Sequence, residues 1–278
     1  MLKQRVITAL VLLALLLPAL LASTAEPLAG LTLVLIAAGA WEWGRLNGFA
    51  MRGALRVAAV CVMLCLYTWS ARWAYDAPAT IWTLTGATWV LVAGWLIRHG
   101  VDRWATISRT VRLVLGVLAL WLTWVAMYQA KVMGINFLLS VLFLVWMADI
   151  AAYFAGRAFG RRKLAPAISP GKSWEGVWGG MVGVLLMACI WIWVDVQFAV
   201  DSPSLFTRLY QRGAPFLVLA TLFLTLMSVA GDLVESLVKR SAGMKDSSHL
   251  LPGHGGVLDR VDALLPALPL ALMLSQTL

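Results

Sequence analysis

Residues 214–240 read APFLVLATLFLTLMSVAGDLVESLVKR. The stretch is apolar up to Gly231 and polar beyond it. A helix from Pro215 to Asp232 rises about 26 Å, against a bilayer hydrocarbon core of about 30 Å. Asp232 is therefore expected near one membrane boundary, with Lys239 and Arg240 emerging beyond it. A transmembrane helix that carries its polar residues at one end decides the fold class.

The rest of the chain has the same character. Of its 278 residues, 62% are hydrophobic and 13% are charged, whereas a soluble domain has about 25% charged residues. The apolar runs are continuous, which predicts helices rather than the alternating strands of a membrane barrel. We predict an all-α, polytopic integral membrane protein with about nine spans, near Val6–Ala22, Leu28–Asn47, Leu55–Trp73, Pro78–Ile97, Val111–Gln129, Val132–Ala155, Trp174–Val194, Ala214–Val238 and Val257–Leu278.

The chain is predicted to form a single transmembrane domain over residues 1–278, with less specific helices in 1–130 and the catalytic half in 131–278. Its net charge is +9, and the cations follow the predicted topology. Eighteen of the 22 Lys and Arg residues fall on the side of the N-terminus, and four fall on the other side: Arg72, Lys131, Arg208 and Arg212. This asymmetry satisfies the positive-inside rule. It indicates topology rather than nucleic-acid binding and places the N-terminus in the cytoplasm.

Asp149 lies within an apolar run near the predicted cytoplasmic end of its span. An ionised carboxylate at mid-membrane costs about 2.5–3.5 kcal/mol on insertion scales. The residue therefore needs a cation, a metal or water. The alternative is a helix-helix pair with a nearby arginine.

A second polar cluster reads ISPGKSWEG over residues 168–176. We expect Pro170 and Gly171 to form a turn and Ser173 to cap the helix that follows. Lys172 and free backbone amides would then form an anion site. The alternative is a capped turn with a topogenic lysine. A P-loop is excluded because the leading glycine and the preceding strand are absent.

A third cluster begins at the end of the opening stretch. Asp232, Glu235 and Lys239 share one helix face through their i, i+3 and i+7 spacing. After a compact polar loop the chain continues as His254-Gly255-Gly256, where the glycines let backbone approach a ligand closely. Asp259 and Asp262 follow at i, i+3, a pattern that suits Mg²⁺. Phosphate oxygens would be held by nearby cations, namely Lys239, Arg240, Lys245 and Arg260. The alternative is that the helix dipole favours the acids and that the cations merely flank spans.

The pattern Ser236-Leu237-Val238-Lys239-Arg240, Lys245-Asp246, His254-Gly255-Gly256, Asp259-Arg260 and Asp262 resembles the signature of phosphatidate cytidylyltransferases (CDP-diacylglycerol synthases). The second cluster resembles that family's Ser-Pro-Lys-Lys-Thr-Trp-Glu-Gly loop, with Gly171 and Ser173 as departures. The opening residues 3–9, KQRVITA, are also similar to the family. The resemblance is specific over residues 149–262 and loose over the first half.

The resemblance implies a bacterial inner-membrane enzyme that converts CTP and phosphatidic acid to CDP-diacylglycerol and diphosphate. It also implies Mg²⁺, a second monovalent cation such as K⁺, and a homodimer. The expected catalytic residues are Asp232, Lys239, His254 and Asp259. The expected metal ligands are Asp232, Asp259 and Asp262. The expected substrate-binding residues are Asp149, Ser169, Lys172, Arg240, Lys245, Gly255, Gly256 and Arg260.

Two other classes compete with this interpretation. Related lipid transferases, such as polyprenol kinases and CDP-alcohol phosphotransferases, are the nearest enzymes, but the latter need an Asp-Gly-x-x-Ala-Arg run that the chain lacks. A transporter would suit Asp149 and the glycine-rich run Gly176–Gly183. Transporters usually show paired broken helices in two related halves, whereas the polar residues here gather at one end of the chain.

Overall fold

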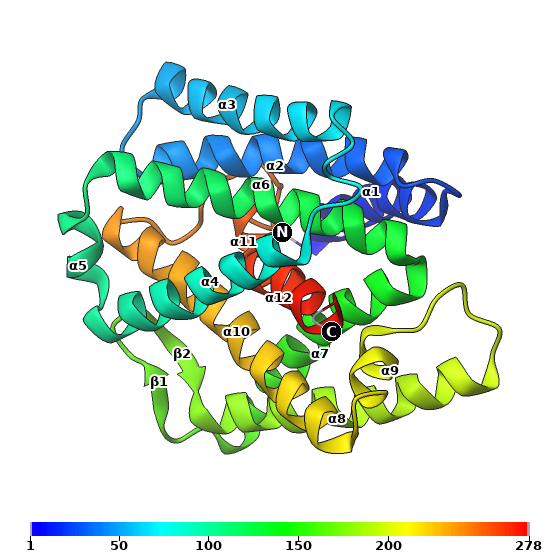
Figure 1. The fold of residues 1–278 in the computed structure, drawn as a ribbon. Coiled ribbons are helices and arrows are strands. Elements are labelled where there is room, and N and C mark those ends of the chain that lie inside the picture. Colours follow the sequence, from blue (N-terminus) through cyan, green and yellow to red (C-terminus); the bar gives the residue numbers. More distant parts are fainter. Residues whose placement is uncertain (1, 277–278) are drawn as a thin grey trace.

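The computed structural model describes the backbone of residues 2–276 and the side chains from Val6 onward. It is helical apart from one small hairpin (Figure 1). The elements are α1 (Leu2–Leu21), α2 (Glu26–Leu46), α3 (Met51–Ser70), α4 (Ala79–His99), α5 (Val101–Thr106), α6 (Arg109–Met133), α7 (Ile135–Phe159), β1 (Lys163–Ala165), β2 (Ser169–Ser173), α8 (Trp174–Gln197), α9 (Leu205–Tyr210), α10 (Ala214–Ser241), α11 (Leu258–Val261) and α12 (Leu264–Gln276). The predicted all-α membrane architecture is confirmed.

Within the described residues, seven helices are long and apolar enough to cross a bilayer: α2, α3, α4, α6, α7, α8 and α10. The first of the other two predicted spans, Val6–Ala22, matches the apolar helical run Val6–Leu21 of α1. The second differs from the prediction. The predicted span Val257–Leu278 is not one helix, because it breaks into α11 and α12, and residues 277–278 lie outside the described part.

Pro266 explains the break before α12. Pro266 has no N–H for the carbonyl of Asp262, four residues earlier, and its ring clashes with a carbonyl in that position. Gly231 of α10 packs against this break, since a Cβ on it would lie 2.5 Å from the Asp262 carbonyl. Pro269 likewise cannot bond Leu265, whose carbonyl accepts the Thr123 hydroxyl at 3.2 Å instead. The break sets the acidic end of this segment against the polar end of α10.

The turn between α6 and α7 lies later than expected. The predicted spans Val111–Gln129 and Val132–Ala155 require a tight turn between them, but α6 continues through it to Met133. The helix ends at Gly134, whose φ of 134° is accessible to glycine. Lys131 is buried and donates hydrogen bonds to the carbonyls of Leu20 at 2.6 Å and Ala22 at 2.9 Å. It therefore binds the free carbonyl end of α1.

Residues 163–173 form an antiparallel hairpin, which corrects the turn expected at Pro170-Gly171. Those two residues lie within β2, and the pairs are Lys163 with Ser173 and Ala165 with Ser169. The turn itself falls at residues 166–168. The predicted helix cap is confirmed, since the Ser173 hydroxyl accepts the amide of Gly176 at 3.2 Å.

The polar loops meet at one end of the bundle, at the left in Figure 1, where α5, the hairpin and the loop after α10 lie. The Arg109 side chain joins two of them by donating to the carbonyls of Asn47 and Gly48. At the other end, Arg212 donates to the Leu274 carbonyl at 2.7 Å. The seven long helices thus separate a loop-rich polar end from the end that carries Arg212.

Candidate functional site

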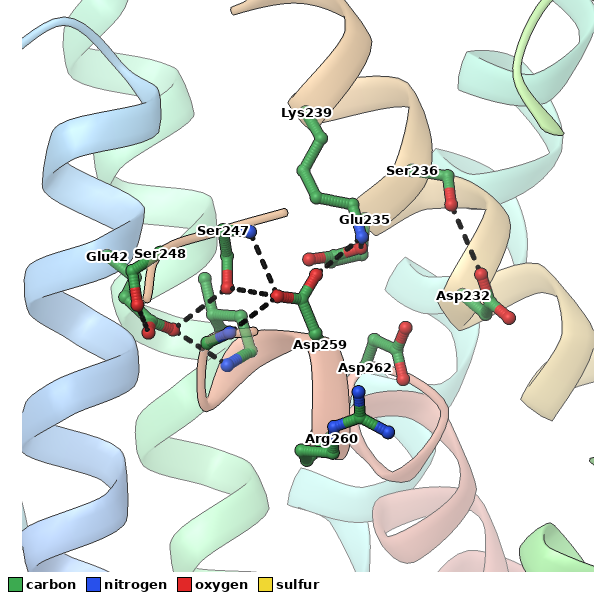
Figure 2. Close-up of polar contacts among 12 residues, drawn as sticks. Glu42, Asp232, Glu235, Ser236, Lys239, Ser247, Ser248, Asp259, Arg260 and Asp262 are labelled. Atoms are coloured by element: carbon green, nitrogen blue, oxygen red, sulfur yellow. Dashed lines mark hydrogen bonds and ion pairs between the residues drawn. The ribbon is translucent and has the colours of Figure 1, made fainter. Parts of the chain in front are cut away.

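The polar end of α10 holds the first part of the site. Glu235 and Lys239 form an i, i+4 ion pair with a distance of 2.5 Å between Oε2 and Nζ. The Glu235 side chain is 3% exposed. One turn earlier, the Asp232 carboxylate accepts the Ser236 hydroxyl at 3.2 Å. Figure 2 shows Glu235 and Lys239 directed toward Asp259 of α11 and Asp232 beside Ser236.

Asp259, on α11, connects α10 to the loop before it. Its Oδ1 atom lies 2.6 Å from Lys239 Nζ. Its Oδ2 atom accepts the Ser247 amide at 2.9 Å, the Ser247 hydroxyl at 2.9 Å and the Gly256 amide at 2.8 Å. Burial raises the pKa of Asp259, but the hydrogen bonds from Lys239, Gly256 and Ser247 outweigh it and hold the pKa below its usual value. Asp259 is therefore ionised and connects the loop to Lys239 of α10.

Glu42 on α2 is a site residue that the sequence analysis missed. Its side chain is completely buried. The carboxylate accepts the hydroxyls of Ser247 at 3.2 Å and Ser248 at 2.5 Å, and the amides of Val257 at 2.9 Å and Leu258 at 2.7 Å (Figure 2). It thus binds the loop between α10 and α11 at two places, in its middle and at its end. A signal was present, because Glu42 is an acid within an apolar run, the criterion that singled out Asp149.

The hairpin brings the second cluster to the third. Lys172 Nζ lies 2.5 Å from Asp232 Oδ2. The Arg240 side chain donates to the Ile168 carbonyl at 3.5 Å, in the hairpin turn. Asp149 interacts electrostatically with Asp232 and Lys172, so it belongs to the same cluster. The alternative that Asp149 pairs with an arginine is not what the structure shows. Ser169 lies at the start of β2, paired with Ala165.

The loop between α10 and α11 encloses a polar pocket of about 340 Å³. Its charged and titratable lining residues are Lys245, Asp246, His249, His254 and Arg260. The Arg260 guanidinium donates to the His254 carbonyl through Nε at 3.0 Å. The backbone turns back on itself here, with the Leu251 amide donating to the Gly255 carbonyl at 2.9 Å and a φ of 82° at Gly255. The pocket can hold a polar, anionic molecule beside the α10 cluster.

Gly256 has a packing reason that the sequence did not suggest. A Cβ at this position would lie 2.0 Å from the Ser247 hydroxyl and 2.4 Å from Glu42 Oε1. A side chain at this position would therefore displace the Glu42 carboxylate and the Ser247 hydroxyl from their hydrogen bonds. A direct contact between Gly256 and substrate stays a prediction.

Carboxylates crowd the centre of the site. Asp262 repels Asp232 electrostatically, and Glu235 is repelled by Asp262 and Asp259. Among residues 2–276, no group of three or more His, Cys, Asp and Glu side chains is close enough to hold a metal ion by itself. Mg²⁺ is usually bound by one or two carboxylates together with substrate phosphates and water. Asp232 and Asp262, which interact electrostatically, fit that donor set.

Comparison with known proteins identifies the relatives of this chain. The model of the cytidylyltransferase family matches residues 3–278. A phosphatidate cytidylyltransferase of Pseudomonas aeruginosa is 38% identical over 97% of this chain and 95% of its own length. That of Haemophilus influenzae is 38% identical over 97% of this chain and 96% of its own length. That of Bacillus subtilis is 40% identical over 49% of this chain and 46% of its own length. The chain belongs to the cytidylyltransferase family.

Proposed function

We propose that this chain transfers a cytidylyl group from CTP to phosphatidic acid. A phosphate oxygen of phosphatidate attacks the α-phosphorus of CTP, the bond from that phosphorus to the bridging oxygen breaks, and diphosphate leaves. CDP-diacylglycerol is the second product. Full-length relatives that carry the name phosphatidate cytidylyltransferase support the proposal.

One observation carries this proposal beyond the family. Lys172 and Lys239 alternate with Asp232, Glu235 and Asp259 at the polar end of a membrane helix. The polar loop pocket adjoins this cluster through Arg260, next to Asp259. A water-soluble nucleotide can reach this cluster from the aqueous side, and a membrane lipid can reach it from the bilayer. A reaction between the two substrates requires a site that is open to both.

The residues divide between the two substrates. The loop pocket would take CTP, with Lys245 and Arg260 against the triphosphate and the backbone at Gly255 and Gly256 close to it. The hairpin and the end of α10 would take the lipid phosphate through Ser169, Lys172 and Arg240. Asp149 would keep Lys172 oriented by its charge.

The nucleophile is already an anion, so the reaction needs no strong general base. Catalysis then consists of positioning and charge stabilisation. Lys239 would stabilise charge on the phosphates that approach it, and His254 would donate a hydrogen bond to the leaving diphosphate. Asp259 would position Lys239 for this task. Asp232 and Lys172 hold each other in place before substrates bind.

Asp232 and Asp262 would hold Mg²⁺, and Asp259 is the third expected ligand. When bound, the ion would neutralise and align the phosphate oxygens. A second, monovalent cation such as K⁺ stays an expectation. Lys172 and Lys239, which lie against Asp232 and Asp259, would bind phosphate oxygens beside the ion.

The proposed setting is a bacterial inner membrane with the site on the cytoplasmic face, where CTP is available. The bias of the Lys and Arg residues toward the end that holds the site supports this orientation. A homodimer is part of the proposal and rests on the family resemblance alone.

The reaction is tested with the purified chain in detergent micelles that contain CTP, Mg²⁺ and dioleoyl phosphatidate. We expect diphosphate and CDP-diacylglycerol in equal amounts, and no diphosphate when the lipid is left out. Diphosphate release that does not depend on phosphatidate, or none with it, would contradict the proposed function.

Asp232→Asn is expected to lower kcat/KM by about 100-fold and to weaken Mn²⁺ binding, because one charged oxygen ligand and the partner of Lys172 are lost together. Mn²⁺ binding measured by electron paramagnetic resonance gives a readout that is independent of turnover. Asp102→Asn is the matched control, since Asp102 is an exposed acid on α5 at the same end of the bundle. Wild-type Mn²⁺ affinity in Asp232→Asn would remove Asp232 from the metal site.

A further inference from the structure

A second cavity lies among the apolar helices, on the membrane side of the catalytic cluster. Its volume is about 300 Å³, at the lower end of the range of about 300–1,000 Å³ for small-molecule sites. The walls come from α4, with Leu84, Thr88 and Val92, and from α6, with Leu115 and Ala119. The lining is almost wholly apolar.

The cavity ends at the site. Gly231 and Glu235 of α10 and Leu258 of α11 line its inner end. Gly231 precedes Asp232 in the sequence, and Leu258 precedes Asp259. Glu235 is the ion-pair partner of Lys239. A molecule that fills the cavity therefore has one end at the charged cluster.

The other end faces the lipid. Leu84 of α4 and Leu118 of α6 line the cavity and are 65% and 39% exposed. In Figure 1, α5 joins the ends of α4 and α6. Instead of closing on each other, α4 packs against α10 and α12, and α6 packs against α2, α3 and α12. The opening between α4 and α6 lies along membrane helices, where the surroundings are hydrocarbon.

Three polar groups in the walls are hydrogen-bonded within the protein. The Thr85 hydroxyl donates to the Ile81 carbonyl at 2.7 Å, and the Thr88 hydroxyl donates to the Leu84 carbonyl at 2.8 Å. The Trp43 indole donates to the Arg112 carbonyl at 3.1 Å. Among the lining groups, the buried indole N–H of Trp104 has no hydrogen-bond partner, and the rest of the surface offers mainly apolar contact. A nucleotide gains nothing there, whereas a hydrocarbon chain does.

We propose that this cavity binds one acyl chain of the lipid substrate, entering between α4 and α6, so that the phosphate of the lipid lies at the Lys172–Lys239 cluster. This proposal rests on the proposed function. The length of the acyl chain then affects the rate through contacts with cavity residues that lie far from the charged cluster.

The test compares two phosphatidates, dioleoyl and dihexanoyl, in the same micelles. Thr88→Trp fills the cavity from α4, and Ala119→Phe fills it from α6. We expect each to lower the ratio of kcat/KM for the dioleoyl lipid to that for the dihexanoyl lipid by about tenfold, because only the long chain reaches the filled volume. Thr83→Trp is the matched control, since Thr83 is exposed on α4 and does not line the cavity, and it should leave the ratio unchanged.

A phosphatidate with a diazirine at the end of one acyl chain gives a readout without turnover. We expect its photolabel on α4 and α6, and less labelling in Thr88→Trp than in Thr83→Trp. Label confined to other helices, or equal ratios in the Thr88 and Thr83 variants, would overturn the acyl-chain site. A wild-type chain that labels on α4 and α6 but releases no diphosphate would instead contradict the proposed function. The labelling is repeated with an excess of unlabelled dioleoyl phosphatidylglycerol or of unlabelled phosphatidate. If the two lipids reduce the labelling equally, the cavity holds a structural lipid, and the proposal is overturned.

Discussion

Glu42→Gln is expected to lower turnover by about 100-fold without unfolding the helical bundle. Glu42 accepts four hydrogen bonds with its two oxygens, two of them from the amides of Val257 and Leu258. A glutamine has one acceptor oxygen and one donor group, so at least one buried amide must face a donor. A buried donor without a partner costs about 1–3 kcal/mol, and about 2.7 kcal/mol corresponds to a factor of about 100 in rate.

The loss should appear as a mobile loop rather than as a missing helix. The loop between α10 and α11 is exposed over residues 242–246 and is bound to α2 through Glu42. We expect faster proteolysis between Ala242 and Gly256 in Glu42→Gln, measured alongside diphosphate release. Glu26→Gln is the control, because Glu26 lies at the other end of α2 and accepts the Tyr128 hydroxyl. Wild-type proteolysis and turnover in Glu42→Gln would show that the loop is held by other contacts.

The polar half of the site was predictable because it obeys local rules. The spacing of Asp232, Glu235 and Lys239 places them on one helix face, and the structure confirms the Glu235–Lys239 pair. The Ser173 cap follows from the residue that precedes the helix and is confirmed. Such features depend on neighbours within a few positions, which the sequence displays directly.

The contacts of the site between residues that are far apart in the sequence were not predictable in the same way. Glu42 lies 215 positions from the Val257 amide that it binds, and no local pattern relates the two. The pairing of Lys172 with Asp232 depends on a hairpin whose strands are three and five residues long, and its Pro-Gly pair is more typical of a turn. The break before α12 had a local signal in Pro266, which the hydrophobicity of the run obscured.

Lys239→Met is expected to have the second large effect, on stability as well as on rate. Lys239 Nζ lies 2.5 Å from Glu235 and 2.6 Å from Asp259, and these two side chains are 3% and 8% exposed. Removal of the lysine leaves two buried carboxylates without their cation, and breaking a buried ion pair from one side costs about 3–5 kcal/mol. We expect a lower temperature of half-denaturation in detergent, measured as the folded fraction that survives heating.

The double variant Lys239→Met with Glu235→Gln separates the two roles of the lysine. It removes one of the two buried carboxylate charges that have lost their cation, so the stability should return in part. Asp259 keeps its hydrogen bonds from Ser247 and Gly256. If Lys239 also stabilises charge on the substrate phosphates, turnover stays low although the protein is again stable. Glu235→Gln alone is the control, because it leaves Lys239 bound to Asp259 and should keep most of the turnover. Recovery of both stability and turnover in the double variant would restrict Lys239 to a structural role, and an unchanged denaturation temperature in Lys239→Met would mean that the buried carboxylates do not depend on its charge.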